Sequence, residues 1–325
     1  MSDQTVPLDD VSPEALEAQA RARLAQADLP GAAALLQHAA RIWSELSDAK
    51  RAGSCWLLAA STLRLAGSMD EAAHAVHRAE LLPLPDALRR GVDMEQAEQA
   101  LASGDAALAR ERFAFVLERH AEHIDDALRA VLLQRRAAAA TASHDERAAA
   151  DDFRAAAALM QAAGLTADAE AARLAAASTL AAVDPAGAEA LWREIDQQPP
   201  RDGAVAARRG LVGGHVAMLG QQPALALARY GAARQGALDA RDAASYLAAS
   251  VQSASLLEQQ GQVDDAYARL ASAWVTLGDL LGKDAAVSLV RPAMQGLRDR
   301  LGTEAFQRVR EGYAARRKRS AGSRV

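Results

Sequence analysis

The sequence predicts an all-α protein, a solenoid of about seven helical hairpins that ends in a C-terminal capping helix pair. Positions typical of the turn between two helices recur every 37 to 41 residues, at Ala27, Gly67, Gly104, His144, Val183, Gly220, Gly261 and Gly302. No stretch alternates apolar and polar residues as a half-buried strand does, so we expect essentially no sheet. A period repeated in this way indicates stacked copies of one helix pair.

The stretch 54–85 contains the clearest copy of this unit. Its first helix presents one face at helical spacing, formed by Trp56, Ala59, Ala60 and Leu63. Gly67 is expected to end that helix, because glycine readily adopts the left-handed conformation common at helix ends. A second helix places Ala72, Val76 and Ala79 on one face and ends near Pro83 and Pro85. Small residues at the crossing predict that the two helices pack closely.

Several helix starts carry recognisable capping residues. Ser12 is expected to be the N-cap of the first helix. Ser68 with Glu71, and Ser143 with Glu146, have the spacing of a capping box, in which each side chain satisfies a free backbone donor. The recurrence of this spacing at equivalent turns supports the repeat register.

No segment rich in proline, glycine or serine divides the chain, which favours one uninterrupted array. We expect helical repeats over 12–283 and a capping helix pair over 284–316. An acidic N-terminal tail, 1–11, and a basic C-terminal tail, 317–325, are expected to be disordered.

The sixth repeat is the least regular. Gly210, Gly213 and Gly214 all fall within its first helix. Each glycine in a helix interior costs on the order of 1 kcal/mol relative to alanine. A close backbone approach or a hinge would explain their presence.

Composition excludes several functional classes. A net charge of −5 argues against a general nucleic-acid-binding surface. The short basic run 316–319 could touch nucleic acid or an anionic membrane, but a solubilising end is the favoured interpretation. Cys55 is the single cysteine, so it excludes an internal disulfide and a cysteine metal cluster, and we predict a core position for it. No apolar leader or membrane span is found, which predicts a cytoplasmic protein.

No residue set carries recognisable catalytic chemistry. Phosphate-binding, zinc-protease and nucleophile-elbow motifs are lacking, so we expect no enzyme and no cofactor. His74 with His77, and His120 with His123, could each offer two metal ligands. Neither pair has an obvious third ligand, and no metal site is predicted.

The stretch 54–85 resembles a tetratricopeptide repeat, with an early aromatic, small residues, a turn glycine, then alanine, a bulky residue, alanine and proline. The period exceeds the common 34 residues and resembles the long-helix repeats of bacterial signalling and regulatory proteins. A HEAT-type solenoid has a similar period, but the turn glycines favour the tetratricopeptide form. The resemblance implies a right-handed superhelix whose first helices line a concave groove that binds peptides.

The resemblance also implies which residues line that groove. Carried onto this chain, the family's spacing points to Leu58, Arg64, Glu98, Arg135, Arg173, Leu174, Leu211 and Gln252. The Lys and Asn clamp of chaperone-binding members is absent. Arg135 and Arg173 could hold a carboxylate or phosphate, or could be ordinary solvated arginines.

These observations predict a non-enzymatic adaptor or scaffold that holds a peptide or partner helix in the groove. The alternative is a regulatory sensor whose superhelix responds to a small peptide or nucleotide. The glycine-rich sixth repeat is the observation that suggests it. The partner and the oligomeric state stay open.

Overall fold

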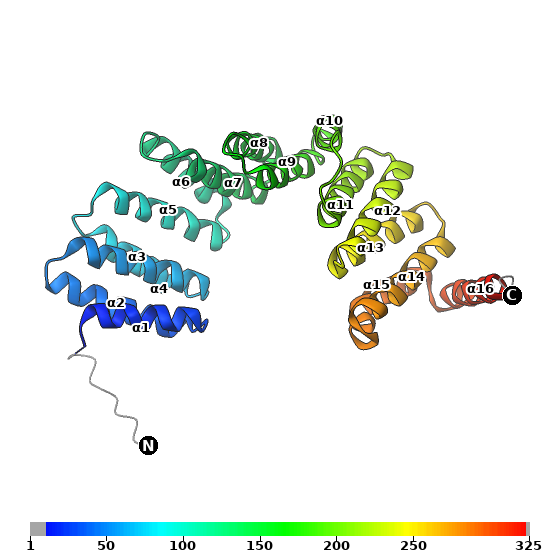
Figure 1. Ribbon diagram of the computed structural model, residues 1–325, viewed down its shortest axis with the longest axis horizontal. Helices are drawn as coiled ribbons and strands as arrows, with labels where there is room; N and C mark the ends of the chain where they lie inside the picture. The colour runs from blue at the N-terminus through cyan, green and yellow to red at the C-terminus, as the bar shows by residue number, and fades with distance from the viewer. Residues whose placement is uncertain (1–10, 323–325) are drawn as a thin grey trace, which may run out of the picture. The chain divides into compact units, whose positions relative to one another are not determined.

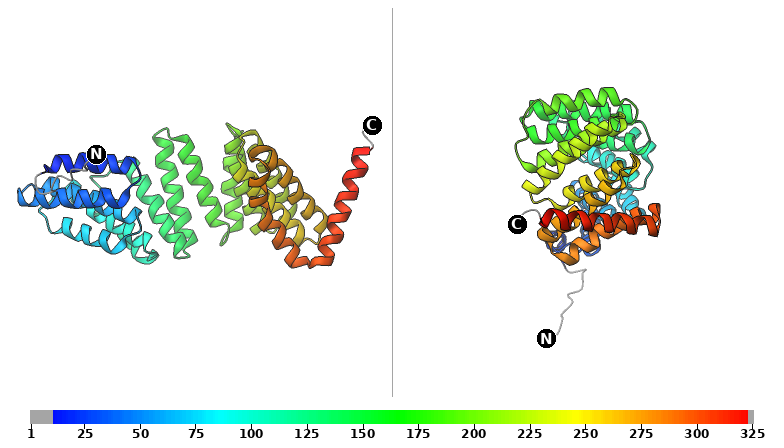
Figure 2. Two further views of the ribbon diagram at one scale, coloured as in Figure 1. Left: turned by 90° about the horizontal axis from the view of Figure 1, so that it is seen from below. Right: turned by 90° about the vertical axis from the view of Figure 1, so that its right-hand side faces the viewer.

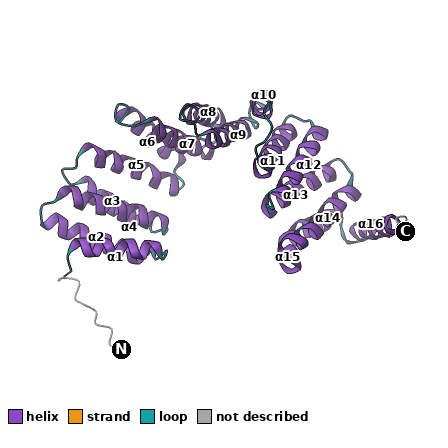
Figure 3. Cartoon of the chain, viewed as in Figure 1, coloured by secondary structure: helices purple, strands orange, loops and turns teal. Residues whose placement is uncertain are grey.

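The computed structural model describes residues 11–322, and every regular element within that range is an α-helix (Figures 1 and 3). The chain forms two compact units, one ending at Ala169 and the other beginning at Glu170. The division falls inside one helix, α9 (Thr166–Leu180), where the sequence offers no linker. We expected a single array, and the two units are described separately below.

The first unit is a stack of helix pairs. Its helices are α1 (Pro13–Ala25), α2 (Leu29–Glu45), α3 (Ala49–Leu65), α4 (Met69–Glu80), α5 (Asp86–Ala102), α6 (Ala106–Arg119), α7 (Asp126–Ala142) and α8 (Glu146–Ala162). Each of these helices packs against the next one along the chain. Figure 2 draws them in colours that run from blue to green. In addition, α3 contacts α5, so consecutive repeats also pack through their first helices.

The second unit continues the same arrangement. Its helices are the end of α9, then α10 (Pro185–Asp196), α11 (Gly203–Leu219), α12 (Pro223–Asp239), α13 (Ala243–Gln259), α14 (Val263–Leu281), α15 (Lys283–Leu301) and α16 (Thr303–Gly322). Each helix from α10 to α15 packs on the helix that follows it, and α11 also contacts α13. Eight helix pairs therefore occur in the described residues, matching seven hairpins and a final pair.

The final helix is longer than expected. We predicted its end at Arg316, but α16 continues to Gly322, because the residues that follow Thr303 include many strong helix formers and no proline. Tyr267 of α14 holds it through edge-to-face contacts with Phe306 and Tyr313, at ring distances of 5.5 and 5.4 Å. The predicted tail segments 1–10 and 323–325 lie outside the described residues.

Turn residues with positive φ set the repeat. The predicted positions Ala27, Gly67, Gly104, His144, Gly261 and Gly302 all have φ between 58° and 84°. In the sixth repeat the turn residue is Gln221 (φ 57°) rather than Gly220, whose φ is −74°. Val183 lies in the turn between α9 and α10 as predicted, but without positive φ, and its N–H and that of Asp184 donate to the Leu180 carbonyl.

Aspartate, rather than serine, caps eight of the sixteen helices in the described residues. In each case the side chain accepts a hydrogen bond from a backbone N–H in the first turn, at Asp28, Asp48, Asp105, Asp125, Asp145, Asp184, Asp202 and Asp242. Ser12 caps α1 as predicted. Ser143 does not cap α8, because the His144 turn places Asp145 at that position, and Ser68 precedes α4 without a side-chain bond.

The core of the clearest repeat follows the prediction. Trp56, Ala59, Ala60, Leu63, Ala72, Val76 and Ala79 are all at most 4% exposed. The Trp56 ring fills the space between the two small-residue faces, and the Arg78 guanidinium lies 5.5 Å from its centroid. Packing therefore explains the strongest sequence pattern in the chain.

Cys55 is also a core residue, 5% exposed, and we expect it to be chemically inert while the protein is folded. Burial, followed by the nearby Glu17 carboxylate, raises the pKa of its thiol from 9.0 to about 12. Because the thiolate is the reactive species, a disulfide reagent at about pH 8 should label the native protein very slowly and the denatured protein completely. Rapid labelling without denaturant would contradict this placement.

The three glycines of α11 mark a close approach, one of the two interpretations that we held open. A methyl group on Gly213 would overlap the indole of Trp192, and one on Gly214 would overlap the ring of Tyr230. At Gly210 it would lie 2.7 Å from the backbone nitrogen of Ala233. Helices α11 and α12 are thus in near-backbone contact.

Candidate functional site

In the first unit, three of the predicted groove residues form a ladder of ion pairs across the first helices of successive repeats. Arg64 on α3 donates from Nε and Nη2 to the Glu95 carboxylate on α5, at 2.9 and 3.1 Å. Its Nη1 also lies 3.9 Å from Glu98. Glu98 in turn pairs with Arg135 on α7, with Nε 3.0 Å from Oε1. The ladder connects α3, α5 and α7.

The ladder neutralises its inner arginine. Hydrogen bonding to Glu95 raises the pKa of Arg64, and only 17% of the Arg64 side chain is exposed. Arg135, by contrast, is 53% exposed and remains accessible to a partner. The sequence reasoning missed Glu95, although it lies one turn before Glu98 and so shares its face.

Leu58 does not belong to the ladder. It is 42% exposed, as predicted, but it lies six residues before Arg64 on α3. At 100° per residue the two side chains point about 120° apart around the helix. The exposed leucine and the ladder therefore belong to different faces.

The predicted residues of the second unit differ in exposure. Leu174 is a core residue, 2% exposed and packed with Ala177 and Trp192, so its prediction as a groove residue was wrong. It lies on the buried face of α9, which the carried-over spacing did not distinguish. Leu211 and Arg173 are half-buried, and Gln252 is exposed on α13. Because Arg135 belongs to the first unit and Arg173 to the second, their joint binding of an anion stays a prediction.

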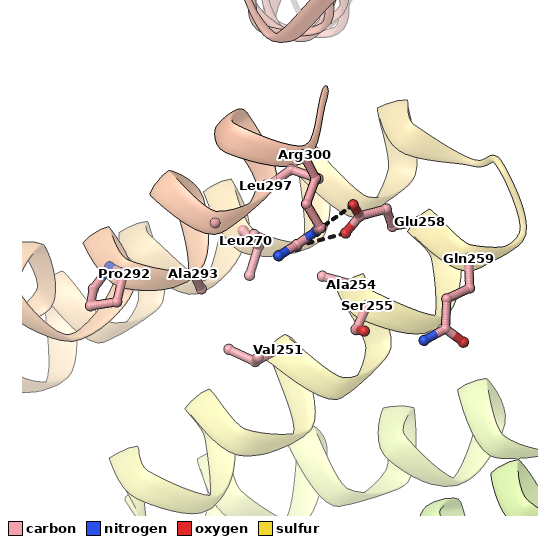
Figure 4. A pocket seen from close by; sticks show the side chains of 11 residues that line it. Val251, Ala254, Ser255, Glu258, Gln259, Leu270, Pro292, Ala293, Leu297 and Arg300 are labelled. Atoms are coloured by element: carbon pink, nitrogen blue, oxygen red, sulfur yellow. Dashed lines mark hydrogen bonds and ion pairs between the residues drawn. The ribbon is translucent and has the colours of Figure 1, made fainter. Parts of the chain in front are cut away.

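A cleft of about 550 Å³ lies between α13 and α15, the first helices of the last two pairs (Figure 4). Its lining is mostly apolar and comprises Val251, Ala254, Leu270, Pro292, Ala293, Gly296 and Leu297, with Ser255, Glu258, Gln259 and Arg300 as polar members. This volume lies within the range of about 300–1,000 Å³ that is usual for ligand pockets. Gln252, the predicted groove residue on α13, follows the lining residue Val251 in the chain but is not part of the lining.

The polar rim of the cleft is ordered by one ion pair. Arg300 donates from Nε and Nη2 to the Glu258 carboxylate at 2.7 and 2.8 Å, which raises the pKa of Arg300 (Figure 4). Ser255 and Gln259 form no side-chain hydrogen bond with any other described residue. They can therefore bond an incoming peptide group.

The sequence contains a pattern that could have predicted this cleft. Its α13 residues follow i, i+3, i+4 and i+7 spacing, and Ala293 and Gly296 remove bulk from the facing helix. The pair 284–316 was treated as a cap, so the free face of its first helix was not considered as a binding surface.

Buried charges lie beneath the glycine-rich helix. The Arg229 guanidinium forms two bonds of 2.7 and 2.8 Å with Glu189 and lies 3.5 Å over the Trp192 ring. It also donates to the carbonyl of Gly213 at 2.9 Å. Arg229 is 8% exposed and Glu189 is 8% exposed, so this cluster fastens α10, α11 and α12 together and is closed to a ligand.

The histidine pairs do not form metal sites in the described residues. His120 bonds Asp93 at 2.8 Å and is 8% exposed. No group of three or more potential metal ligands occurs within residues 11–322. Over the same range, no helix combines the length and the apolar character needed to cross a membrane.

Comparison with known proteins supports the fold. No family model matches the chain, and no curated protein matches it. A tetratricopeptide repeat protein from Parabacteroides merdae superposes with a TM-score of 0.55 at 14% identity, covering 87% of this chain and 98% of that one. The apo form of the quorum sensor NprR from B. thuringiensis gives a TM-score of 0.55 at 12% identity, covering 95% and 88%. The chain therefore has the all-α tetratricopeptide-like solenoid fold.

Proposed function

We propose that this protein is a non-enzymatic adaptor that binds a peptide segment of a partner protein on its first-helix faces. The observation that carries the proposal is the cleft between α13 and α15, with its apolar floor and ordered polar rim. In the tetratricopeptide resemblance, this is also the side on which partners bind. A cytoplasmic location in a bacterium is part of the same proposal.

The dimensions of the cleft suit a short extended segment. From Val251 to Gln259 the wall runs about 12 Å along α13, which corresponds to roughly four residues of extended chain. One apolar side chain would lie on Ala254, Leu270 and Leu297, while Ser255 and Gln259 would bond the peptide backbone. The ion pair between Glu258 and Arg300 offers both charges at the rim, which favours polar flanking residues.

Gly296→Leu should block the cleft without unfolding the protein. An added Cβ would meet only the end of the Arg300 side chain, Nη1 at 3.1 Å and Cζ at 3.9 Å, and no backbone atom, so the helix can hold a side chain there if the Arg300 guanidinium shifts slightly. Peptides selected from a displayed library on the wild type should bind the variant about tenfold more weakly or worse, a loss of about 1.4 kcal/mol. Isothermal titration calorimetry measures the affinities, and thermal unfolding verifies that the variant is folded.

Gly278→Leu is the matched control, since nothing lies within 4 Å of a Cβ at that α14 position. It should keep wild-type affinity. Equal binding by the wild type and Gly296→Leu would place the peptide elsewhere, and failure to select any peptide would contradict the adaptor role. Native proteins retained by the wild type and lost with Gly296→Leu would identify the partner.

The structure supports the adaptor better than the alternative ligand sensor. The sensor was motivated by a hinge in the glycine-rich sixth repeat, but Gly213 and Gly214 pack against Trp192 and Tyr230. The likeness to a quorum sensor concerns the fold alone, at 12% identity.

A further inference from the structure

A second cleft, of about 370 Å³, lies between α12 and α14 on a different face of α13 from the first. Its lining residues are Arg234, Leu257, Asp265, Ala268, Arg269 and Ser272. Two arginines from different helices thus share one small space. Asp265 is the only acidic member of the lining, so the formal charge of the cleft is positive.

Four other buried or half-buried arginines are matched to carboxylates, whereas the half-buried Arg90 and Arg129 donate to backbone carbonyls. Two-pronged pairs join Arg64 to Glu95, Arg136 to Asp152, Arg209 to Glu170, and Arg229 to Glu189. Within residues 11–322, neither Arg234 nor Arg269 lies within ion-pair distance of a carboxylate. The cleft therefore brings together two arginines that have no carboxylate partner among the described residues.

Arg234 is held in place by neutral groups. Its Nη2 donates to the Tyr246 hydroxyl at 2.7 Å and its Nε donates to the Ser250 hydroxyl at 3.1 Å. The Tyr246 hydroxyl donates in turn to the Thr276 hydroxyl oxygen, 3.2 Å away, and this fixes the direction of the hydrogen bonds in the network. The guanidinium is therefore oriented while its charge is left uncompensated.

Arg269 occupies a position that is ion-paired in other repeats. It lies eight residues after the positive-φ turn residue Gly261, as Asp152 does after His144 and Arg229 after Gln221. Asp152 pairs with Arg136, and Arg229 pairs with Glu189. Arg269 stands at the same position of its repeat, but it forms no ion pair with any described residue.

The electrostatics of the cleft favour an added anion. Burial, and then the charge of Arg234, lower the pKa of Arg269, while Tyr246 and Asp265 act in the opposite direction without cancelling the shift. Two neighbouring cations in a partly desolvated space repel each other. An anion between them would remove that repulsion and form charge-assisted hydrogen bonds.

We propose that the cleft between α12 and α14 binds a phosphate group through Arg234 and Arg269, with the Ser272 hydroxyl as a further donor. A phosphate dianion matches two cations better than a carboxylate does, and its oxygens can bond both guanidinium groups at once. The volume of about 370 Å³ has room for a small phosphate ester as well as for free phosphate. This site is independent of the peptide cleft.

Arg269→Gln tests the site, because Arg269 forms no hydrogen bond with any described residue and its loss should leave the fold intact. With inorganic phosphate as the probe, calorimetry should show one saturable site in the wild type and at least tenfold weaker binding in the variant. Without phosphate, the variant should melt at the same temperature as the wild type or higher, because the repulsion is gone.

Arg308→Gln on α16 is the matched control and should bind phosphate like the wild type, since Arg308 is exposed and is not a lining residue. Because phosphate stabilises many proteins by exclusion from their surface, the comparison is made between variants at equal ionic strength. Tighter binding of AMP than of phosphate would identify an esterified source, and equal binding a free one. No saturable binding, equal binding by Arg269→Gln, or acetate binding as well as phosphate would overturn the proposal.

Discussion

Replacing Glu189 with alanine should destabilise the second unit by about 3–5 kcal/mol, because the change leaves a buried guanidinium without its counter-charge. Arg229 is 8% exposed, and both Glu189 oxygens bond it. The Arg229 Nε has no hydrogen-bond partner in the described residues, and besides Glu189 this guanidinium bonds just the Gly213 carbonyl among them, so little else can replace the carboxylate. Denaturant unfolding followed by circular dichroism measures the loss.

Glu194→Ala on the same helix is the control for Glu189→Ala, since Glu194 is exposed and forms no ion pair with any described residue. It should change stability by less than about 0.5 kcal/mol. Acid provides a second check. Hydrogen bonding to Arg229 lowers the pKa of Glu189 below 4.5, so its contribution is complete above that pH and is lost as the pH falls through the lower, folded-state pKa. A difference from wild type that persists unchanged in strong acid would contradict the ion-pair explanation.

Gly213→Ala should destabilise the protein by about 1–3 kcal/mol, the usual range for overpacking a core. Helix propensity alone predicts the opposite, a gain of about 1 kcal/mol. The added methyl group would overlap the Trp192 indole, whose Nε1 already donates to the Arg209 carbonyl at 3.0 Å. The indole cannot move without losing that bond and its contact with Arg229.

Gly231→Ala in α12 is the matched control for Gly213→Ala, because nothing lies within 4 Å of a Cβ there. Thermal unfolding should show that it stabilises the protein by about 1 kcal/mol. If both variants gain stability, the packing of α11 against Trp192 of α10 is not what retains glycine at position 213.

Local patterns predicted the fold well because each helix pair is specified by its own residues. Trp56 and its small neighbours gave the packing face, and Gly67 gave the turn. The N-caps were harder, since Ser143 and Asp145 are both good caps and the backbone at His144 decides between them. Capping chemistry alone could not select one residue.

The sequence analysis did not predict the ion pairs, although the spacing of the charged residues along the chain indicates them. Glu189 and Arg229 are 40 residues apart, Glu170 and Arg209 are 39 apart, and Glu258 and Arg300 are 42 apart. These separations equal about one repeat, so opposite charges spaced by the period indicate contacts between neighbouring pairs. Leu174 shows the converse limit, because its exposure depends on how α9 is rotated, and the carried-over spacing did not determine that rotation.

The positive-φ turns affect which substitutions the chain can tolerate. Ala27, Ser47, His144, Gln221 and Arg241 adopt a conformation that costs a residue with a side chain roughly 1–2 kcal/mol. The hairpin imposes this geometry on whatever residue stands there, so substitutions can accumulate at the turns without moving the helices. The same helix arrangement can therefore be formed by very different sequences, in keeping with a shared fold at 12–14% identity.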